Sequence, residues 1–431
     1  MHRYRPIPAA LFEKKRAALT SKMQPGSIAI FHSNACMPRN GDQCYPFRQN
    51  SDFFMLCGID RQPAALILFP DAPKPEWKEV LFIPYTDEHM RIWEGESYTP
   101  QQATEISAIQ HVEFYDQFKP LLQQMLYHAE HIYLYTDEQL KFQPSVPTPH
   151  HQLIDYIRQH YPTHHVLRIH PLLRSLRMIK LPEEVDLINT ACAITRDTFV
   201  ETLPHIRPGV FEYEIEAHIL SGFLRRGANG HAFYPIVASG HNSCVLHYTD
   251  NAQQCEDGDI LLLDFGAEYA NYAADITRCV PVNGTFSPRQ RQVYEAVLRI
   301  LRQATQLLRP GITLSDYEKR VGSLVERELL QLGLLTQQDI DNQDPKKPAY
   351  KKYFMHGTSH HLGLDVHDTA DREQPLQPGM VLTCEPAIYI REENLGIRLE
   401  NDILITEDEP INLTADIPIE IDEIEALLQA K

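Results

Sequence analysis

Two aspartates interrupt an apolar segment whose pattern is that of two paired β-strands. The segment DGDILLLDFGAEYANYAADITR covers residues 257–278, and its two strand-like runs contain Asp264 and Asp275. A buried carboxylate costs free energy unless it is paired or bound to a cation, and two carboxylates on adjacent strands repel each other. Solvent-facing edge positions are the alternative, but the run ILLL directly before Asp264 fits that alternative poorly. The pair therefore favours a metal site.

A second segment, MHGTSHHLGLDVHD (355–368), is rich in histidine and contains His356, His360, His361 and His367. A lone histidine is more often a core or surface residue than a metal ligand. Several histidines close together, interleaved with aspartates and glycines, indicate a functional site. We expect some of them to orient ligands or contact a substrate instead of binding metal.

Two glutamates interrupt later strand patterns in the same way. Glu385 follows the apolar run in VLTCEPAIYI (381–390), and Glu400 lies inside GIRLENDILIT (396–406). Taken singly, either one could be an ion-paired glutamate, with Arg398 as a partner.

Together these residues form a set of metal-binding side chains. Four carboxylates offset the charge of two divalent cations, and a water bridging both cations can be hydroxide near neutral pH. The oxygen-rich set favours Mn²⁺, although Co²⁺, Zn²⁺ or Fe²⁺ would also fit. The predicted ligands are Asp264, Asp275, His360, Glu385 and Glu400.

The chain up to about residue 170 mixes short strand-like runs with helical stretches. The runs predicted to be strands are 28–33, 53–59, 64–70, 79–84 and 131–137. The His- and Pro-rich stretch 149–165 is predicted to be a surface helix and loop. The pattern changes near 171–182, so we expect an α/β chain with domains at 1–172 and 173–431.

The second domain contains a weak internal sequence repeat. A long amphipathic helix is predicted from Pro182, and another from Pro288 with Ser287 as its N-cap. Each is followed by an R-P-G motif, at Arg207 and at Arg309, and then by more helix and strands. This repeat predicts a pseudo-twofold domain with a site between its halves. The alternative is chance use of R-P-G to end a helix.

Composition excludes some classes of function. The 431 residues carry 58 acidic and 40 basic side chains, a net charge of −18, and no basic run typical of nucleic-acid binding. The apolar runs are too short to span a membrane, and the N-terminal stretch lacks the apolar core of a signal peptide. The eight cysteines are scattered without a CxxC pair, which favours reduced thiols in a cytoplasmic protein.

The segments LLLDFGAEYANYAADITR, HGTSHHLGLDVHD, TCEPAIYI and GIRLENDILIT resemble the pita-bread metallopeptidases, which include methionine aminopeptidase, prolidase and aminopeptidase P. CVLHYTDN (244–251) and YPFRQNSDFFMLCGI (45–59) are most similar to aminopeptidase P. The resemblance implies a creatinase-like N-terminal α/β domain, concerned with oligomerisation and substrate access. It also implies a C-terminal pseudo-twofold pita-bread catalytic domain of mixed α/β (α+β) class.

The resemblance also implies an activity, which is release of an N-terminal residue when proline comes second, with a metal-bridging hydroxide as nucleophile. Asp275 and Glu400 would bridge the metals. His367 would donate to the oxyanion, and Glu385 would carry a proton to the leaving nitrogen. The residues expected on the substrate side are His247, His356, His367, Tyr389 and Arg398, of which His247 and His356 would line the proline side.

Two positions depart from the family pattern or extend it. His361 follows the ligand histidine where some relatives carry tryptophan, which puts the packing of the pocket there in question. Trp93 could reach the site of a neighbouring subunit, as a tryptophan does in some relatives, or could be a surface residue in a loop. Since relatives are dimers or tetramers, we expect a homodimer or homotetramer.

Three alternatives remain open. Prolidase shares the metal ligands but cleaves only Xaa-Pro dipeptides. A creatinase-type C–N hydrolase shares the fold but usually lacks the full ligand set. A non-catalytic binding module on this fold would typically have lost metal ligands, whereas all five are present here.

Overall fold

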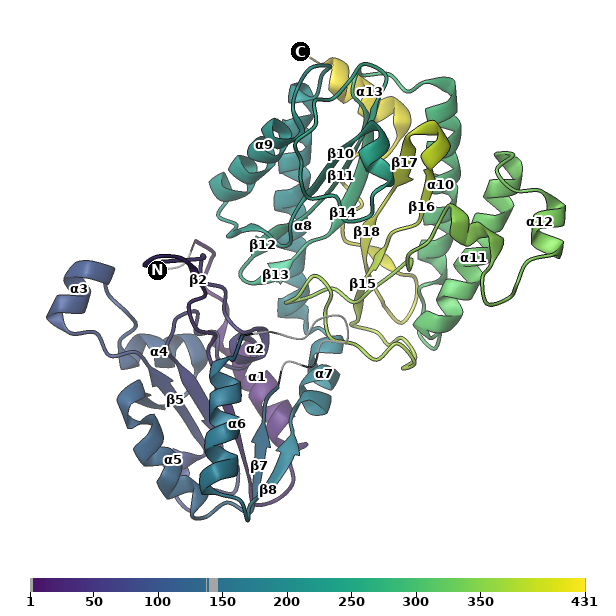
Figure 1. Cartoon of the computed structure of the whole chain (residues 1–431). Coiled ribbons are helices and arrows are strands. Elements are labelled where there is room, and N and C mark those ends of the chain that lie inside the picture. The colour runs from purple at the N-terminus through teal and green to yellow at the C-terminus, as the bar shows by residue number, and fades with distance from the viewer. Residues whose placement is uncertain (1–2, 137, 139–145, 431) are drawn as a thin grey trace. The chain divides into compact units, whose positions relative to one another are not determined.

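The structure, a computed structural model, describes residues 3–136, 138 and 146–430. It divides into two compact units, one spanning Tyr4–Arg177 and the other running from Met178 to the C-terminal end. Figure 1 shows the chain with many of the elements named below labelled. The change of unit falls inside helix α7 (His170–Met178), a few residues beyond the boundary expected from sequence.

A six-stranded sheet forms the centre of the N-terminal unit. Its order is β6-β5-β4-β1-β7-β8, in which β1 pairs parallel with β7 and antiparallel with β4. The strands are β1 (Ser27–His32), β4 (Ala65–Leu68), β5 (Glu79–Ile83), β6 (His111–Phe114), β7 (His131–Leu134) and β8 (His165–Arg168). Four of the five predicted strands are therefore present, and residue 137 lies outside the described residues.

The predicted strand at 53–59 is wrong, because this segment forms helix α2 (Ser51–Cys57). The Asn50 side chain caps the helix by accepting a hydrogen bond from the Phe53 N–H, and Gly58 ends it in a left-handed conformation. Residues 52–57 are all buried, so the helix is apolar on nearly every side. A short, fully apolar run cannot be told from a buried strand by periodicity.

The N-terminal unit contains further helices besides α2 and α7. They are α1 (Ala9–Thr20), α3 (Glu88–Glu94), α4 (Pro100–Ser107), α5 (Phe118–Leu126) and α6 (Pro149–His160). A separate hairpin is made by β2 (Pro38–Asn40) and β3 (Gln43–Cys44). The prediction for 149–165 holds for α6, but His150 on this helix is buried instead of lying at the surface.

The first half of the C-terminal unit contains the helix predicted from Pro182 and a three-stranded antiparallel sheet in the order β10-β11-β14. Its elements are α8 (Pro182–Thr202), α9 (Glu212–Arg225), β9 (Gly230–His231), β10 (Ile236–Ser239), the 3-10 turn η4 (Gly240–Cys244), β11 (Ile260–Phe265), β12 (Ala267–Tyr269), β13 (Tyr272–Ala273) and β14 (Ile276–Pro281).

The second half repeats the sequence of helix, helix and strands. Its elements are α10 (Pro288–Leu307), α11 (Leu314–Gln331), α12 (Gln337–Asp341), β15 (Val381–Cys384), β16 (Ala387–Ile390), β17 (Leu395–Arg398), β18 (Asn401–Leu404), β19 (Ile411–Asn412) and α13 (Ile421–Gln429). Strand β17 contacts β11 and β14, so the strands of the two halves adjoin. Figure 1 shows these strands between α8 and α9 on one side and α10 and α11 on the other.

The two R-P-G motifs have the same structural role. Gly209 and Gly311 both adopt left-handed backbone conformations, with φ of 87° and 89°, in the turns that join α8 to α9 and α10 to α11. A residue with a Cβ is strained there, so glycine is needed at both positions. The internal sequence repeat therefore corresponds to the same type of turn, used once in each half of the unit.

None of the described helices is both long and apolar enough to cross a membrane. All eight cysteines are free thiols, with Cys36 and Cys44 exposed and the other six buried.

Candidate metal centre

Strands β11 and β14 bring the two aspartates of the apolar segment together. Asp264 lies opposite Thr277 in their antiparallel ladder, and Asp275 directly precedes β14. Between them, the hairpin β12–β13 turns through Ala270 and Asn271, both with positive φ, as in a type I′ turn. The predicted pair of strands therefore places both carboxylates at one end of the sheet.

Three of the five expected ligands form a cluster. Single ligand atoms of Asp275, His360 and Glu400 all lie within 4.8 Å of one another. His360 Nε2 is 3.5 Å from Asp275 Oδ2. A backbone hydrogen bond holds Glu400, between β17 and β18, beside β14, because the Glu400 N–H donates to the Thr277 carbonyl at 3.1 Å. Residues far apart in the chain thus meet, with Asp275 just before β14, Glu400 between β17 and β18, and His360 in the segment that precedes β15.

Glu385 lies beside this cluster. It follows β15, and its N–H donates to the Thr358 carbonyl at 2.9 Å. Its carboxylate is 3.7 Å from His360 Nε2 through Oε1 and 3.6 Å from His356 Nδ1 through Oε2. Glu385 therefore faces both the cluster and the expected substrate side.

Asp264 has a different environment from the other carboxylates. One of its oxygens, Oδ2, is bound by the Arg398 guanidinium. The other, Oδ1, is buried without a hydrogen-bond partner among the described residues. The sequence had suggested Arg398 as a partner for one of the glutamates, and its ion pair is instead with Asp264.

Burial and mutual repulsion both act on these carboxylates. Burial raises the pKa of Asp275 well above its ordinary value, and the charges of Glu400 and Asp264 raise it further. Burial likewise raises the pKa of Glu400, with Glu385 and Asp264 adding to the effect. Buried oxygens that repel one another, one of them unpartnered, together with an imidazole, form a donor set that fits divalent cations.

Hydrogen bonds extend from the cluster to the expected substrate side. Thr277 Oγ1 donates to Glu400 Oε2 at 2.6 Å and accepts from Arg398 Nε at 3.0 Å. Arg398 Nη1 donates to the Tyr389 hydroxyl at 2.8 Å, and this hydroxyl lies 2.9 Å from His356 Nε2. Four of these five residues were named from sequence, and Thr277 was not.

His356 has a defined protonation state in this chain. Burial and the nearby Arg398 lower the pKa of His356 to about 3, so the ring is neutral near pH 7. Its Nδ1 lies 2.7 Å from the Gly357 carbonyl and is therefore assigned the proton. Nε2 is then left to accept from Tyr389. The chain of donors runs from Arg398 through Tyr389 to His356.

The remaining expected histidines lie in different surroundings. His367 is exposed, and its ring centroid is 4.4 Å from that of His360 at 84°. His247 is exposed on the segment after η4, near enough to His356 to affect its pKa. His361 is buried, with Nδ1 unpartnered among the described residues, so it belongs to the packing behind the cluster.

Several residues that support the cluster were missed by sequence reasoning. The Asp402 carboxylate accepts from the Asp275 N–H at 3.0 Å, and Glu318 accepts from the Thr358 N–H at 2.7 Å. Lys180 and Asp368 form a buried ion pair at 3.1 Å. Asp402, inside the buried run NDILIT, carried the same signal as Asp264, and Asp368 belongs to the histidine-rich segment, whereas Glu318 and Lys180 carried no such signal.

Trp93 lies on helix α3 and not in a loop, and its side chain is 75% exposed.

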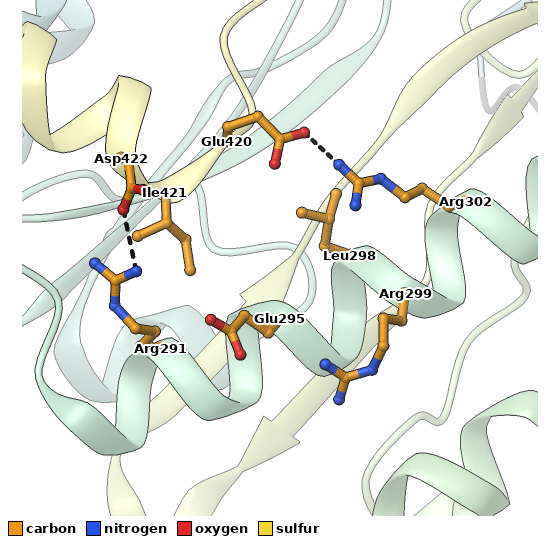
Figure 2. Close-up of a pocket in the computed structure, with 8 residues that line it drawn as sticks. All are labelled: Arg291, Glu295, Leu298, Arg299, Arg302, Glu420, Ile421 and Asp422. Atoms are coloured by element: carbon orange, nitrogen blue, oxygen red, sulfur yellow. Dashed lines mark hydrogen bonds and ion pairs between the residues drawn. The ribbon is translucent and has the colours of Figure 1, made fainter.

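A surface hollow over α10 is lined by three arginines (Figure 2). Arg291 pairs with Asp422 and Arg302 with Glu420, as the dashed lines show, and Arg299 pairs with Glu328. Since each guanidinium has a carboxylate partner, the hollow is a solvated ion-pair surface, and we assign it no role.

Comparisons with known proteins identify both units. A family model described as Metallopeptidase family M24 matches residues 186–407. A second model, described as Aminopeptidase P, N-terminal domain, matches residues 12–135. The "Xaa-Pro aminopeptidase" of Escherichia coli (strain K12) is 36% identical over 446 residues, which cover 97% of this chain and 97% of that protein.

Solved structures of E. coli aminopeptidase P have the same fold. The Zn-substituted enzyme in complex with product has a TM-score of 0.89 at 33% identity, over 99% of each chain. The enzyme with the inhibitor Pro-Leu has a TM-score of 0.88 at 34% identity, again over 99% of each chain. The mixed α/β fold, with its N-terminal domain and C-terminal pita-bread domain, is therefore confirmed.

Proposed function

The chain belongs to metallopeptidase family M24, and we propose that it is a metal-dependent aminopeptidase that hydrolyses the N-terminal Xaa-Pro bond of peptides. The observation that carries this proposal is the cluster of Asp275, His360 and Glu400, whose ligand atoms lie within 4.8 Å of one another. It is joined to Arg398, Tyr389 and His356 by hydrogen bonds. A metallopeptidase combines a cation site with a polar substrate side in this way.

The proposed ligands of two divalent metal ions are Asp264, Asp275, His360, Glu385 and Glu400. When bound, such ions supply Lewis-acid polarisation and an activated water at neutral pH. Mn²⁺ is the proposed ion, because four of the five donors are carboxylates and hard oxygen ligands suit it. A Zn-substituted form of the E. coli relative has been solved, so Zn²⁺ is a second candidate ion for this type of site.

The other side chains have roles that follow from their surroundings. The Tyr389 hydroxyl is held by Arg398, so its orientation is fixed before a substrate arrives. Neutral His356 and exposed His247 are proposed to line the proline side. Exposed His367, next to His360, is proposed to donate to the developing oxyanion.

Glu385 is proposed to move a proton to the leaving nitrogen. Its carboxylate lies between His360 and His356, so it reaches from the metal cluster to the substrate side. The nitrogen of proline is tertiary in the peptide and must gain a proton as it leaves. Once Glu385 has taken a proton from the attacking water, its carboxyl group can pass that proton to the leaving nitrogen.

The N-terminal unit, a homodimeric or homotetrameric assembly and a cytoplasmic location belong to the same proposal. The N-terminal unit is proposed to serve oligomerisation and substrate access. Six of the eight cysteines are buried free thiols, which is compatible with a reducing compartment. Size-exclusion chromatography with light scattering measures the assembly directly.

A peptide assay tests the activity. We expect purified protein with Mn²⁺ to release the first residue of an Xaa-Pro-Yaa tripeptide and to leave an Xaa-Ala-Yaa control nearly intact. Cleavage of Xaa-Pro dipeptides alone would identify a prolidase. No cleavage by metal-loaded protein would leave the non-catalytic binding module as the better account.

A further inference from the structure

One carboxylate distant from the metal cluster in sequence is fully buried at the start of α9. Glu212 is the first residue of that helix, and its relative exposure is 0%. Burial of a carboxylate is costly unless hydrogen bonds replace its water. The helix N-terminus contributes a favourable partial charge, but further donors are needed.

All the side-chain partners of Glu212 come from one segment, residues 239–253, which we call the His247 loop. Oε1 accepts from the Ser239 N–H at 2.7 Å and from Asn242 Nδ2 at 3.4 Å. Oε2 accepts from the Tyr248 hydroxyl at 2.7 Å and from the Gln253 N–H at 2.8 Å. The carboxylate therefore holds both ends and the middle of the loop.

The backbone reinforces this arrangement. The Glu212 N–H donates to the Gln253 carbonyl at 3.0 Å, and the Cys255 N–H donates to the Val210 carbonyl at 2.8 Å. The start of α9 and the end of the His247 loop are thus paired like two strands. The Glu212 side chain completes this pairing by reaching across to Ser239, where the loop begins.

The His247 loop also contacts the strands that carry the substrate-side residues. Ser243 Oγ accepts from the Gly396 N–H at 2.8 Å, and Gly396 pairs with Tyr389 between β17 and β16. His247 itself is exposed and lies next to Tyr248, which binds Glu212. Its position is therefore set by the anchors of the loop on either side.

We propose that Glu212 is a positioning residue that fixes the His247 loop, and through it His247, on the substrate side of the site. This inference rests on the proposed function. An exposed side chain on an unanchored loop samples many positions, and catalysis is sensitive to displacements of about 1 Å. Glu212 removes that freedom without touching substrate.

Glutamine at position 212 is a sharp probe, because the four partners are all donors in this arrangement. An amide has one oxygen and one NH₂ group, so one side of the new side chain can no longer accept. In either orientation, the backbone N–H of Ser239 or of Gln253 loses its acceptor. The size of the side chain is unchanged.

Glu214 provides a matched control two residues along the same helix. Its exposed carboxylate accepts from the Phe211 N–H at 2.8 Å in a capping interaction, and glutamine serves equally well there. Glu214→Gln removes the same charge from the same helix turn, but it leaves the His247 loop untouched.

The experiment compares wild type, E212Q, E214Q, H247A and the E212Q/H247A double variant on an Xaa-Pro-Yaa tripeptide with Mn²⁺. We expect E212Q to lower kcat/KM by roughly 10- to 100-fold, mainly through kcat, with bound metal unchanged. E214Q should stay within about twofold of wild type. E212Q should cause little further loss when H247A is already present, because it acts through His247.

An equal loss in both backgrounds would overturn the proposal, as would full activity of E212Q. Should E212Q fail to fold by circular dichroism, Tyr248→Phe removes one donor and gives the same comparison with a smaller loss. A Tyr248→Phe loss that persists beside H247A would also overturn it. Inactive wild type and E214Q would instead refute the proposed function, and this inference with it.

Discussion

The guanidinium of Arg398 binds the carboxylate of Asp264, so one of the five proposed metal ligands already has a cation beside it. The same guanidinium contacts Thr277 and Tyr389. Its charge and its fork of donors therefore connect the metal cluster to the substrate side. These two roles can be separated by substitution.

Arg398→Met should lower kcat/KM by about 100-fold or more, because Tyr389 and Asp264 lose their buried partner. Metal binding should persist, since removing a positive charge beside four carboxylates does not weaken their attraction for cations. Kinetics and elemental analysis measure the two effects. Arg398→Lys keeps the charge without the fork and should recover only part of the activity. Loss of metal from Arg398→Met would contradict this account.

Thr277→Val should weaken metal binding by about 10- to 100-fold. Thr277 is buried, and its hydroxyl orients Glu400 while accepting from Arg398, whereas valine has nearly the same shape and no hydroxyl. Titration of the chelated protein with Mn²⁺ measures the affinity. Thr277→Ser keeps the hydroxyl and is the control. Equal affinities of the valine variant and wild type would show that Glu400 needs no support.

Removing a ligand should abolish activity while leaving the fold intact. Asp264→Ala and Glu400→Ala are each expected to lose hydrolysis, with unchanged circular dichroism.

Glu400→Gln relieves repulsion among buried carboxylates, so in chelator it should be more stable than wild type, by about 1–3 kcal/mol. Thermal melts with EDTA and with Mn²⁺ test this. Wild type should be stabilised by Mn²⁺, whereas Glu400→Gln should respond little.

The N-terminal unit should lose stability in mild acid because of His32. Burial lowers the pKa of His32 from 6.5 to about 4, so the folded state keeps the ring neutral while the unfolded chain binds a proton. The stabilisation that comes from keeping this ring neutral is complete above pH 6.5 and is lost as the pH falls toward 4. The resulting loss in the free energy of unfolding reaches about 3 kcal/mol. Its neighbours are the Tyr115 hydroxyl, 3.3 Å from Nδ1, and the rings of Phe118 and His150.

Urea unfolding followed by tryptophan fluorescence measures this effect, because both tryptophans, Trp77 and Trp93, lie in the N-terminal unit. His32→Asn should flatten the dependence on pH, although burial also lowers the pKa of His150, which will leave a remainder. His128→Asn alters an exposed histidine and should keep the wild-type slope. An unchanged slope in His32→Asn would refute the assignment.

The sequence was most informative where burial conflicts with charge. Asp264, Asp275 and Glu400 stood out because each interrupts an apolar run, and the structure places all three at the ends of neighbouring strands. Ser287 and Pro288 marked the start of α10 by the chemistry of helix capping. These signals are local, so one sequence was enough to find them.

Other features depend on contacts that no local pattern records. The apolar run at 53–59 forms a helix because Asn50 and Gly58 cap it, and its periodicity could not show this. Glu212 and Thr277 have ordinary sequence neighbours, and their importance lies in partners far along the chain. The burial of His361, expected near the substrate pocket, likewise follows only from tertiary packing.

The central claim is that five side chains hold two metal ions on which hydrolysis depends. Titration of chelated protein with Mn²⁺, with bound metal and Xaa-Pro-Yaa cleavage measured on the same samples, tests it most directly. The account predicts two ions per chain and activity that rises with metal occupancy. In Glu400→Ala, it predicts that the chain no longer binds two ions and no longer cleaves the peptide. Full cleavage by metal-free protein, or two ions still bound by Glu400→Ala, would contradict it.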